Sequence, residues 1–154
     1  MQKDNRKEMQ DQFVRLCKAH GLKITPQRIA IFMALAGSTE HPSADNIYRS
    51  IHREYPHISF ETVNRTLLLF VEKGLLDVVE SFSGARRFDP HTGQHHHIHC
   101  IKCGQIVDVF EEALDQVAIP ESISKNYHVL GKRVVVHVIC PACQSNQSKI
   151  KETL

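Results

Sequence analysis

The 154-residue sequence contains no tryptophan, and aromatic residues make up only 6% of it. Aliphatic side chains must therefore fill the core, and an apolar fraction of 42% supports a packed core rather than a disordered chain. No apolar run approaches the roughly 18–20 residues that span a bilayer, and no hydrophobic stretch follows the N-terminus as in a secretory signal. We therefore expect a cytoplasmic protein of one ordinary domain or two small ones, with no membrane partner.

The sequence also lacks a strong net charge, because its formal value is only +2 at pH 7. The charge is unevenly distributed: residues 1–36 carry seven Lys or Arg against three Asp or Glu, whereas residues 90–154 carry six of each. An anionic partner is therefore expected at the N-terminal part, although a solvated helix face would show the same excess. Disulfides are rare in the cytosol, so paired cysteines are expected to bind metal or to act in redox chemistry.

The first half of the chain has the hydrophobic period of amphipathic helices. One helix is expected over about residues 6–20, and three more begin after the N-cap residues Thr25, Ser43 and Ser59. The period then changes to that of strands over residues 76–82 and 86–88, joined by a Ser-Gly turn. Helices followed by a β-hairpin predict a winged helix-turn-helix domain.

The second half mixes strands and helices. Asp89-Pro90-His91-Thr92-Gly93 marks a change of composition and predicts a hinge over 89–94. We expect an α+β chain with a winged-helix domain over residues 1–88 and a small α/β domain over 95–154. The elements expected in the latter are strands at 96–101, 105–110 and 134–139, a helix at 111–118 and a second helical segment at 121–125.

Four cysteines form two C-x-x-C pairs, Cys100 with Cys103 and Cys140 with Cys143, separated by 36 residues. Two such pairs can supply the closed tetrahedral thiolate shell of a structural zinc ion. A redox role would need one pair at a helix N-terminus and would leave the other pair unexplained. Cys17 lies outside this pattern, on the apolar face of the first helix, and is expected in the core.

A run of imidazoles, Gln94-His95-His96-His97-Ile98-His99, directly precedes the first cysteine pair. In an extended segment His95, His97 and His99 share one face and His96 lies on the other. Same-face histidines can chelate one ion, and nearby aspartates would make a mixed nitrogen and oxygen site suited to iron(II), manganese(II) or zinc. An exposed histidine run with adventitious affinity is the alternative reading.

These motifs together resemble the ferric uptake regulator family of bacterial metalloregulators, over about residues 12 to 143. The matching segments are Thr25-Pro26-Gln27-Arg28, His41-Pro42-Ser43-Ala44-Asp45-Asn46-Ile47-Tyr48, Ser59 with Thr62-Val63, Arg87-Phe88-Asp89, His95-x-His97-x-x-Cys100-x-x-Cys103-Gly104, Ile106-Val107-Asp108 and Cys140-x-x-Cys143.

The resemblance implies a homodimeric transcriptional repressor, not an enzyme, that binds operator DNA through winged-helix heads and dimerises through its C-terminal domain. It implies one structural zinc ion at the four cysteines and one regulatory iron(II) or manganese(II) ion per subunit. Carried over by position, the regulatory ligands are His41, Asp89, His95, His97 and Asp108. An ion bound by both domains would stabilise one relative orientation and couple metal level to DNA affinity.

Two features bear on the branch of the family. Asp108 stands where iron sensors more often have glutamate, which resembles the peroxide-sensing branch, where bound iron(II) reacts with peroxide and a ligand histidine is oxidised. The iron-sensing branch often has a further metal site, whose matching positions here are Gln94, His96, Asp115 and Lys132. A protonated lysine cannot ligate and glutamine is a poor ligand, so both features favour a peroxide sensor over an iron-responsive or zinc-responsive regulator.

The fourth helix is predicted to be the recognition helix, with Thr62 and Arg65 on its solvent face. Arg65 suits a bidentate contact to guanine, and Asn64, where the family usually has tyrosine, can read adenine. Side chains predicted to contact phosphates are Lys23, Arg28, Arg86 and Arg87. Each could equally be an ordinary surface charge. Two other classes of protein stay possible from sequence: a thiol redox enzyme and a metal-storage or delivery protein.

Overall fold

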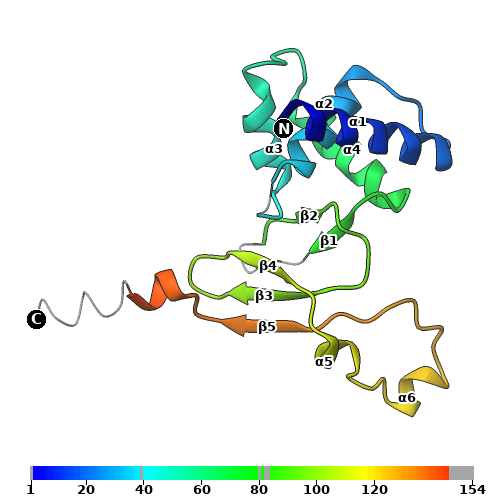
Figure 1. The fold of residues 1–154 in the computed structure, drawn as a ribbon, viewed down its shortest axis with the longest axis vertical. Coiled ribbons are helices and arrows are strands. Elements are labelled where there is room, and N and C mark those ends of the chain that lie inside the picture. Colours follow the sequence, from blue (N-terminus) through cyan, green and yellow to red (C-terminus); the bar gives the residue numbers. More distant parts are fainter. Residues whose placement is uncertain (1, 39, 80, 82–83, 146–154) are drawn as a thin grey trace, which may run out of the picture. The chain divides into compact units, whose positions relative to one another are not determined.

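The computed structural model describes residues 2–38, 40–79, 81 and 84–145, and for residues 2–5 only the backbone. The chain divides into two compact units, residues 1–92 and 93–154 (Figure 1). This division falls inside the segment 89–94, whereas Asp89 itself ends a strand of the first unit. No helix in the described part of the chain is long and apolar enough to cross a membrane.

The described residues of the N-terminal unit form four helices followed by a two-stranded hairpin, which confirms the predicted winged helix-turn-helix class. Its elements are α1 (Gln2–Ala19), α2 (Pro26–Ala36), α3 (Ala44–His52), α4 (Phe60–Glu72), β1 (Asp77–Val79) and β2 (Arg87–Asp89).

Hydroxyl side chains begin three of these helices, as predicted. Thr25 Oγ1 accepts from Arg28 N at 3.3 Å, Ser43 Oγ from Asn46 N at 3.2 Å, and Ser59 Oγ from the third residue of α4 at 3.2 Å. Each bond satisfies an amide that the helix itself cannot pair, and such caps typically contribute about 1 kcal/mol. The Asn46 side chain also accepts from Ser43 N, which completes a reciprocal cap.

The core of this unit is mainly aliphatic, with a few aromatic rings concentrated at its centre. Phe13 of α1 stacks on Phe32 of α2 at 4.5 Å between centroids and meets Phe70 of α4 edge-on at 5.5 Å. Cys17 is fully buried beside them, as expected for a small core residue, and burial raises the pKa of its thiol. Aliphatic residues complete this core: Ile31, Leu35, Ile47, Ile51, Ile58, Val63, Leu67, Leu75 and Leu76.

In the described residues, the strands of the wing begin one residue later than predicted, at Asp77 and Arg87. β1 and β2 pair antiparallel with Val78 opposite Phe88, and Gly84 between them has φ +72°. Residues 80, 82 and 83 of the predicted strand and turn lie outside the described residues. β2 also contacts the loop before α3, because Phe88 N donates to Pro42 O at 3.1 Å. The wing is therefore tied to the loop that carries His41.

The C-terminal unit is a three-stranded sheet in the order β4-β3-β5, with β3 (His96–Cys100) at its centre. β4 (Ile106–Val109) follows through a tight turn and runs antiparallel to β3. β5 (Val135–Val138) returns through a long connection and runs parallel to β3. The strand order therefore brings both cysteine pairs to one end of β3 and β5.

The helix predicted over 111–118 is wrong in length. α5 (Glu112–Asp115) is a single turn, and α6 (Glu121–Ser124) is another. Neither buries a residue or has a side-chain N-cap bond, so neither gains the tertiary packing that sustains longer helices. Pro120 also disfavours a helical conformation at the preceding residue.

Candidate metal centres and DNA-contacting surface

The four cysteines converge on one point in the C-terminal unit. Cys100 Sγ lies 4.0 Å from Cys143 Sγ, and Cys103 Sγ lies 3.8 Å from Cys140 Sγ. All four sulfur atoms lie within 4.8 Å of one another. A tetrahedral zinc ion with Zn–S bonds of about 2.3 Å separates its sulfur atoms by about 3.8 Å. The observed spacing fits this ion, and four thiolates leave no open position for a substrate.

Backbone geometry at the end of β3 positions the first cysteine pair. Cys100 N donates to Gln105 O and Gly104 N to Cys100 O, both at 2.9 Å, and Gly104 has φ +74°. Cys140 N in turn donates to Cys100 Sγ at 3.4 Å. Hydrogen bonds from the backbone of Cys103 and then of Cys140 lower the pKa of Cys100 to about 6. The Cys100 thiol therefore ionises at a lower pH than an ordinary cysteine.

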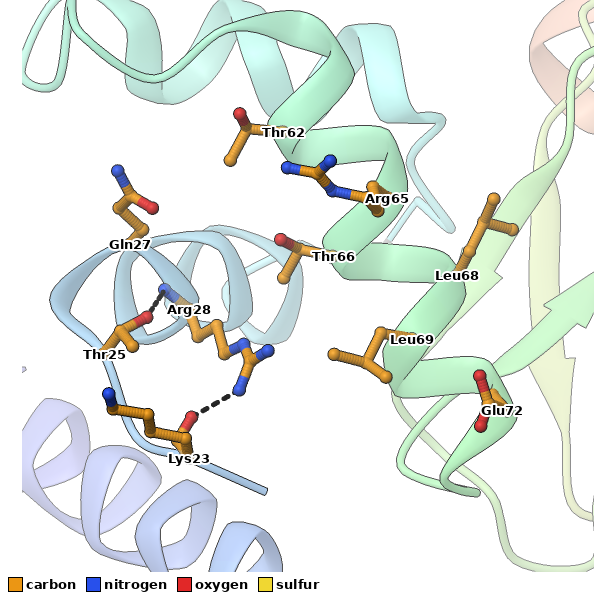
Figure 2. A pocket seen from close by; sticks show the side chains of 10 residues that line it. All are labelled: Lys23, Thr25, Gln27, Arg28, Thr62, Arg65, Thr66, Leu68, Leu69 and Glu72. Atoms are coloured by element: carbon orange, nitrogen blue, oxygen red, sulfur yellow. Dashed lines mark hydrogen bonds between the residues drawn. The ribbon is translucent and has the colours of Figure 1, made fainter.

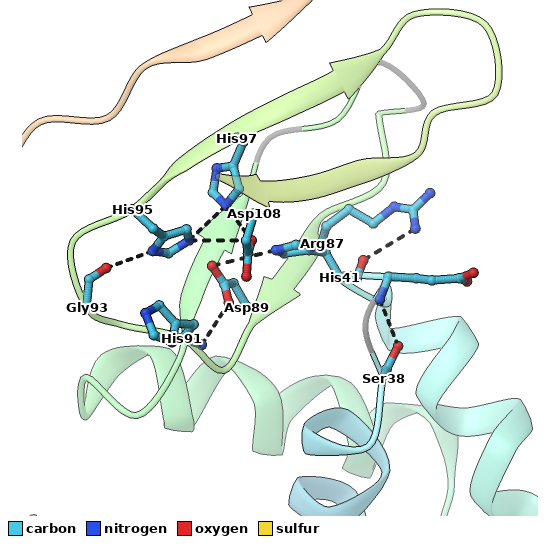
Figure 3. A network of polar contacts seen from close by, with 10 residues as sticks. Ser38, His41, Arg87, Asp89, His91, Gly93, His95, His97 and Asp108 are labelled. Carbon is cyan, nitrogen blue, oxygen red and sulfur yellow. Dashed lines mark hydrogen bonds and ion pairs between the residues drawn. The ribbon is translucent and has the colours of Figure 1, made fainter. Parts of the chain in front are cut away.

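In the N-terminal unit, His41 and Asp89 face each other in a buried setting. His41 Nε2 lies 3.7 Å from Asp89 Oδ2, with side-chain exposures of 5% and 1%. Asp89 Oδ1 also accepts from His91 N at 2.7 Å, and Arg87 Nη1 donates to His41 O at 3.3 Å. These contacts hold the imidazole and the carboxylate near one another (Figure 3).

The backbone of His41 is left-handed, with φ +48°. This conformation is uncommon for residues other than glycine, and histidine is among the side chains that tolerate it. It costs on the order of 1 kcal/mol or more, which the wing contacts to Pro42 O and His41 O help to offset. The loop thus uses backbone strain to aim a histidine toward Asp89.

In the C-terminal unit, three side chains gather on one side of β3 and β4. His95 Nε2 lies 3.0 Å from His97 Nε2, and Asp108 Oδ1 lies 3.6 Å from His95 Nε2 and 3.4 Å from His97 Nε2. The strand register sets this arrangement, because His97 pairs with Asp108 across the antiparallel ladder. Two imidazoles and a carboxylate at these distances can hold a divalent ion of intermediate hardness.

A backbone carbonyl favours the tautomer of His95 that a metal ligand needs. His95 Nδ1 lies 2.7 Å from Gly93 O, so the ring proton on Nδ1 can be donated to this carbonyl (Figure 3). The lone pair then lies on Nε2, the atom that faces His97 and Asp108. Metal-binding histidines are commonly oriented by such an outer hydrogen bond.

The remaining histidines of the run have other surroundings. His96 is fully buried on the opposite face, where its Nε2 lies 3.1 Å from Asp115 Oδ1. His99 is buried and pairs with His137 of β5, with 6.2 Å between ring centroids. The alternation predicted for the run is therefore observed, and the partners of His96 and His99 come from segments far along the chain.

Several residues predicted to contact DNA line one cavity of about 530 Å³ in the N-terminal unit. Figure 2 shows α2 on one side and α4 on the other, with Lys23 and Arg28 opposite Thr62 and Arg65. Arg28 Nη1 donates to Lys23 O at 2.5 Å, which holds the guanidinium at the start of α2. Gln27, for which the sequence predicts no DNA contact, lines the same cavity.

The residues predicted to contact DNA differ in how far their side chains are exposed to solvent. Arg65 and Arg86 are exposed, while Asn64 and Thr62 are half-buried. Arg87 is half-buried, and its Nη1 is engaged by His41 O. Its Nε is buried with no hydrogen-bond partner among the described residues. Arg87 therefore supports the His41 loop, a role that the sequence did not suggest because the two residues are far apart along the chain.

The sequence and the fold of this chain are similar to those of known metalloregulators. The model of the ferric uptake regulator family matches residues 19–137. A peroxide-responsive repressor, PerR, from Staphylococcus epidermidis is 35% identical over 137 residues, covering 89% of this chain and 91% of that protein. The chain belongs to the ferric uptake regulator family. The resemblance predicted from the motifs is confirmed, and the peroxide-responsive relative agrees with the expected branch.

Solved structures of the family agree with the fold. PerR from Streptococcus pyogenes, studied for peroxide sensing and gene regulation, is 29% identical, with a TM-score of 0.50 over 88% of this chain and 93% of that one. The ferric uptake regulator of Helicobacter pylori, which has three functional metal-binding sites, is 23% identical, with a TM-score of 0.69 over 90% of this chain and 93% of that one. At that identity the second likeness concerns the fold alone.

Proposed function

We propose that this family member is a metal-dependent, DNA-binding transcriptional repressor that responds to peroxide. The observation that carries the proposal is the convergence of His95, His97 and Asp108 on one point, with His95 oriented by Gly93 O. Peroxide-responsive relatives at 34–35% identity support the same branch. Iron-responsive and zinc-responsive regulation are the alternatives within the family.

The proposal assigns two ions to each subunit. Cys100, Cys103, Cys140 and Cys143 bind a structural zinc ion, for which their sulfur spacing is suited. His41, Asp89, His95, His97 and Asp108 together bind one regulatory iron(II) or manganese(II) ion.

The five regulatory ligands come from both units of the chain. Each unit supplies buried imidazole groups and a carboxylate, buried at Asp89 and half-buried at Asp108, that lie close together within that unit. An ion that accepts ligands from both would favour one relative orientation of the units. DNA affinity then depends on metal, because a ligand shifts an equilibrium by its differential affinity for the two states.

Iron(II), when bound, supplies the one-electron chemistry toward peroxide that manganese(II) lacks. The ligand residues of the chain determine which side chains this oxidation can reach. His95 is oriented by Gly93 O and His41 by its strained loop, so each imidazole would be available as a ligand within its own unit. Oxidation of either imidazole by peroxide would remove the lone pair with which it can ligate and would weaken the regulatory site. The expected result is release of DNA.

For DNA recognition we propose a homodimer in which α4 enters the major groove of a double-stranded operator. Arg65 is exposed on α4 and can contact a guanine edge. Thr62 and Asn64 lie beside it on the same helix, while Lys23, Arg28 and Arg86 contact phosphates. These last contacts add affinity and little specificity.

The proposal includes a cytoplasmic location and no enzymatic activity. Reduced thiols are stable in that compartment, as the four-cysteine cluster requires. A thiol redox enzyme would need a C-x-x-C pair that is accessible and independent, whereas the two pairs here share one cluster of sulfur atoms. Catalytic turnover of a disulfide substrate by zinc-free protein that keeps its fold would favour that other class.

A mobility shift assay with the protein's own promoter tests metal activation. We expect tight binding with manganese(II) and loss of binding in chelator, with zinc retained in both samples. Equal binding in chelator would exclude activation by the regulatory ion. Non-operator DNA of the same length is the control for the electrostatic contribution.

Mass spectrometry of the iron(II)-loaded protein after mild peroxide tests the peroxide response. We expect one added oxygen at His41 or His95, together with loss of operator binding. The manganese(II)-loaded protein should stay unmodified and bound. Unmodified histidines with retained DNA binding in the iron form would instead indicate an iron-responsive regulator.

A further inference from the structure

Four residues of the C-terminal unit form a closed polar cluster on the side of β3 away from His95 and His97. Gln94 Nε2 donates to Asp115 Oδ1 at 3.0 Å and to Lys132 O at 3.1 Å. His96 Nε2 lies 3.1 Å from Asp115 Oδ1. Lys132 Nζ donates to Asp115 O at 2.5 Å and also to Val117 O. The cluster joins the start of β3, α5 and the segment before β5.

The tautomer of His96 is fixed by the backbone of the chain. Val134 N donates to His96 Nδ1 at 3.0 Å, so Nδ1 must carry a lone pair. In the neutral ring the proton then sits on Nε2, where it is donated to Asp115 Oδ1. A metal ion at Nε2 would need that lone pair, and Nδ1 would then carry a proton that opposes the Val134 N–H. His96 is therefore held in a form that cannot ligate.

The Lys132 ammonium supplies the positive charge that an ion would otherwise bring. It binds the carbonyls of Asp115 and Val117 at the C-terminal end of α5, where helix carbonyls lack intrahelical partners. The hydrogen bond from Gln94, followed by that from His96, lowers the pKa of Asp115. The carboxylate thus stays ionised beside a protonated lysine.

We propose that Lys132 is the built-in cation of this cluster, which excludes a divalent ion and fastens α5 to the sheet whatever the metal supply. The Helicobacter pylori relative has three functional metal-binding sites. In this chain the cluster gives the dimerisation domain metal-independent order, and the ions bound per subunit are the two assigned above. Metal sensing then depends on the regulatory ion alone.

Removal of a carboxylate separates this proposal from a hidden metal site. Full-length protein is dialysed against zinc(II) or manganese(II), and bound metal is counted for wild type, Asp115→Asn and the matched α5 variant Glu112→Gln. We expect the same count for all three. Loss of one equivalent in Asp115→Asn only would overturn the proposal.

Variants at Lys132 test its role as the cation. In Lys132→Ala we expect faster amide hydrogen exchange over residues 112–117, while Lys125→Ala, an exposed lysine bonded to Glu121, leaves that segment unchanged. The double variant Gln94→His with Lys132→His should gain a third zinc equivalent that Asp115→Asn then removes. Unchanged exchange in Lys132→Ala, or no gain in the double variant, would contradict the role of Lys132.

Nitrogen chemical shifts of His96 in the wild-type protein test the tautomer without any substitution. We expect a proton on Nε2, and no change in either nitrogen when excess zinc(II), which is diamagnetic, is added to protein whose two assigned sites already hold zinc. A zinc-dependent shift at Nε2 would show ligation and overturn the proposal. This measurement is independent of DNA binding, so its outcome stays distinguishable from that of the proposed repressor function.

Discussion

At the scale of single residues, neighbouring histidines in one run acquire opposite chemistry from the backbone atoms beside them. His95 Nδ1 faces a carbonyl oxygen at Gly93, which leaves Nε2 available to a metal. His96 Nδ1 faces an amide N–H at Val134, which places the proton on Nε2. One residue type therefore serves as a candidate ligand and as a structural hydrogen-bond donor at adjacent positions.

Asp108 is the carboxylate through which the regulatory ion can be tested at residue scale. It lies 3.4–3.6 Å from both ligand imidazoles, so Asp108→Asn removes charge with little change of shape. We expect manganese(II) binding to weaken by more than about 10-fold, in line with losses seen when groups around metal sites are changed. Equilibrium titration measures this, with Glu111→Gln as the control carboxylate.

Unchanged manganese affinity in Asp108→Asn would place the regulatory ion elsewhere. Zinc at the four cysteines should be retained in both variants, because their sulfur atoms form a separate cluster. Loss of zinc as well would show a general defect of folding and would be seen in the circular dichroism spectrum.

The cysteine cluster gives a second residue-scale prediction, concerning protons released on zinc binding. The pKa of Cys100 is lowered from 9.0 to about 6, and that of Cys143 is raised to about 12, chiefly by its hydrogen bond to Cys140. Near neutral pH, Cys100 is already ionised in the zinc-free fold, so its proton is not among those that zinc displaces.

The sign of this pH dependence follows from the direction of the Cys100 shift. A lowered pKa stabilises the zinc-free fold fully above the ordinary value of 9.0, and this contribution is lost as pH falls through about 6. Below that pH, Cys100 is protonated in the zinc-free fold, so zinc binding should release about one more proton than near neutral pH. A pH-indicator titration with zinc measures the number, and an unchanged release across pH 6 would contradict the lowered pKa.

At the scale of elements, the wing also supports the loop that carries His41. β2 contacts the His41 loop through Phe88 N and the Arg87 guanidinium, whereas the adjacent Arg86 is exposed. Arg86 and Arg87, at the start of β2, therefore have different surroundings. One supports a candidate metal ligand and the other is available to a phosphate.

Arg86→Ala and Arg87→Ala form a matched pair that separates these tasks. In Arg87→Ala we expect weaker manganese(II) binding, because His41 loses the contact that holds its strained loop. Operator binding should then recover at higher manganese. In Arg86→Ala we expect unchanged manganese affinity and weaker binding to every DNA sequence, with a shallower salt dependence. Identical behaviour of the two variants would contradict this division.

Elements differ in how far sequence could predict them. The starts of α2, α3 and α4 were predictable because Thr25, Ser43 and Ser59 bond to amides only three residues away. The length of α5 was not, because a short apolar stretch does not reveal whether it will be buried. The zinc cluster was predictable because two C-x-x-C pairs limit the chemistry to very few alternatives.

The candidate regulatory residues were predicted by resemblance, while the atoms that orient them were not. Gly93 O, Val134 N and Arg87 act through contacts that depend on strand register and on loop paths. Val134 lies 38 residues from His96, and Arg87 lies 46 residues from His41. No local pattern encodes such pairs, so Gln94 and Lys132 could be recognised from the sequence as unsuited to metal, but not as partners of His96 and Asp115 in one cluster.

At the scale of the whole molecule, the division into two compact units gives the proposed regulation its physical basis. The N-terminal unit carries α4 and the His41–Asp89 pair, and the C-terminal unit carries the His95, His97 and Asp108 group. A regulatory ion that accepts ligands from both units must favour some relative orientations over others. DNA bound by two heads of a dimer also selects among those orientations.

Thermodynamic linkage turns this into a quantitative prediction. If manganese(II) tightens operator binding by some factor, operator DNA must tighten manganese binding by the same factor, because both routes reach the same ternary complex. We expect a coupling of roughly 5–150-fold, the usual range for coupled sites. Manganese titrations with and without operator measure one factor, and mobility shifts with and without manganese measure the other.

Non-operator DNA and two variants test whether the coupling between manganese and operator binding arises from the orientation of the two units. Non-operator DNA, bound mainly through phosphates, should tighten manganese binding much less than the operator does, because it does not demand one spacing of the recognition helices. In Asp108→Asn the operator factor should fall toward one, while Lys132→Ala should preserve it. If operator affinity rises with manganese and manganese affinity ignores the operator, the ion does not act by selecting an orientation of the two units.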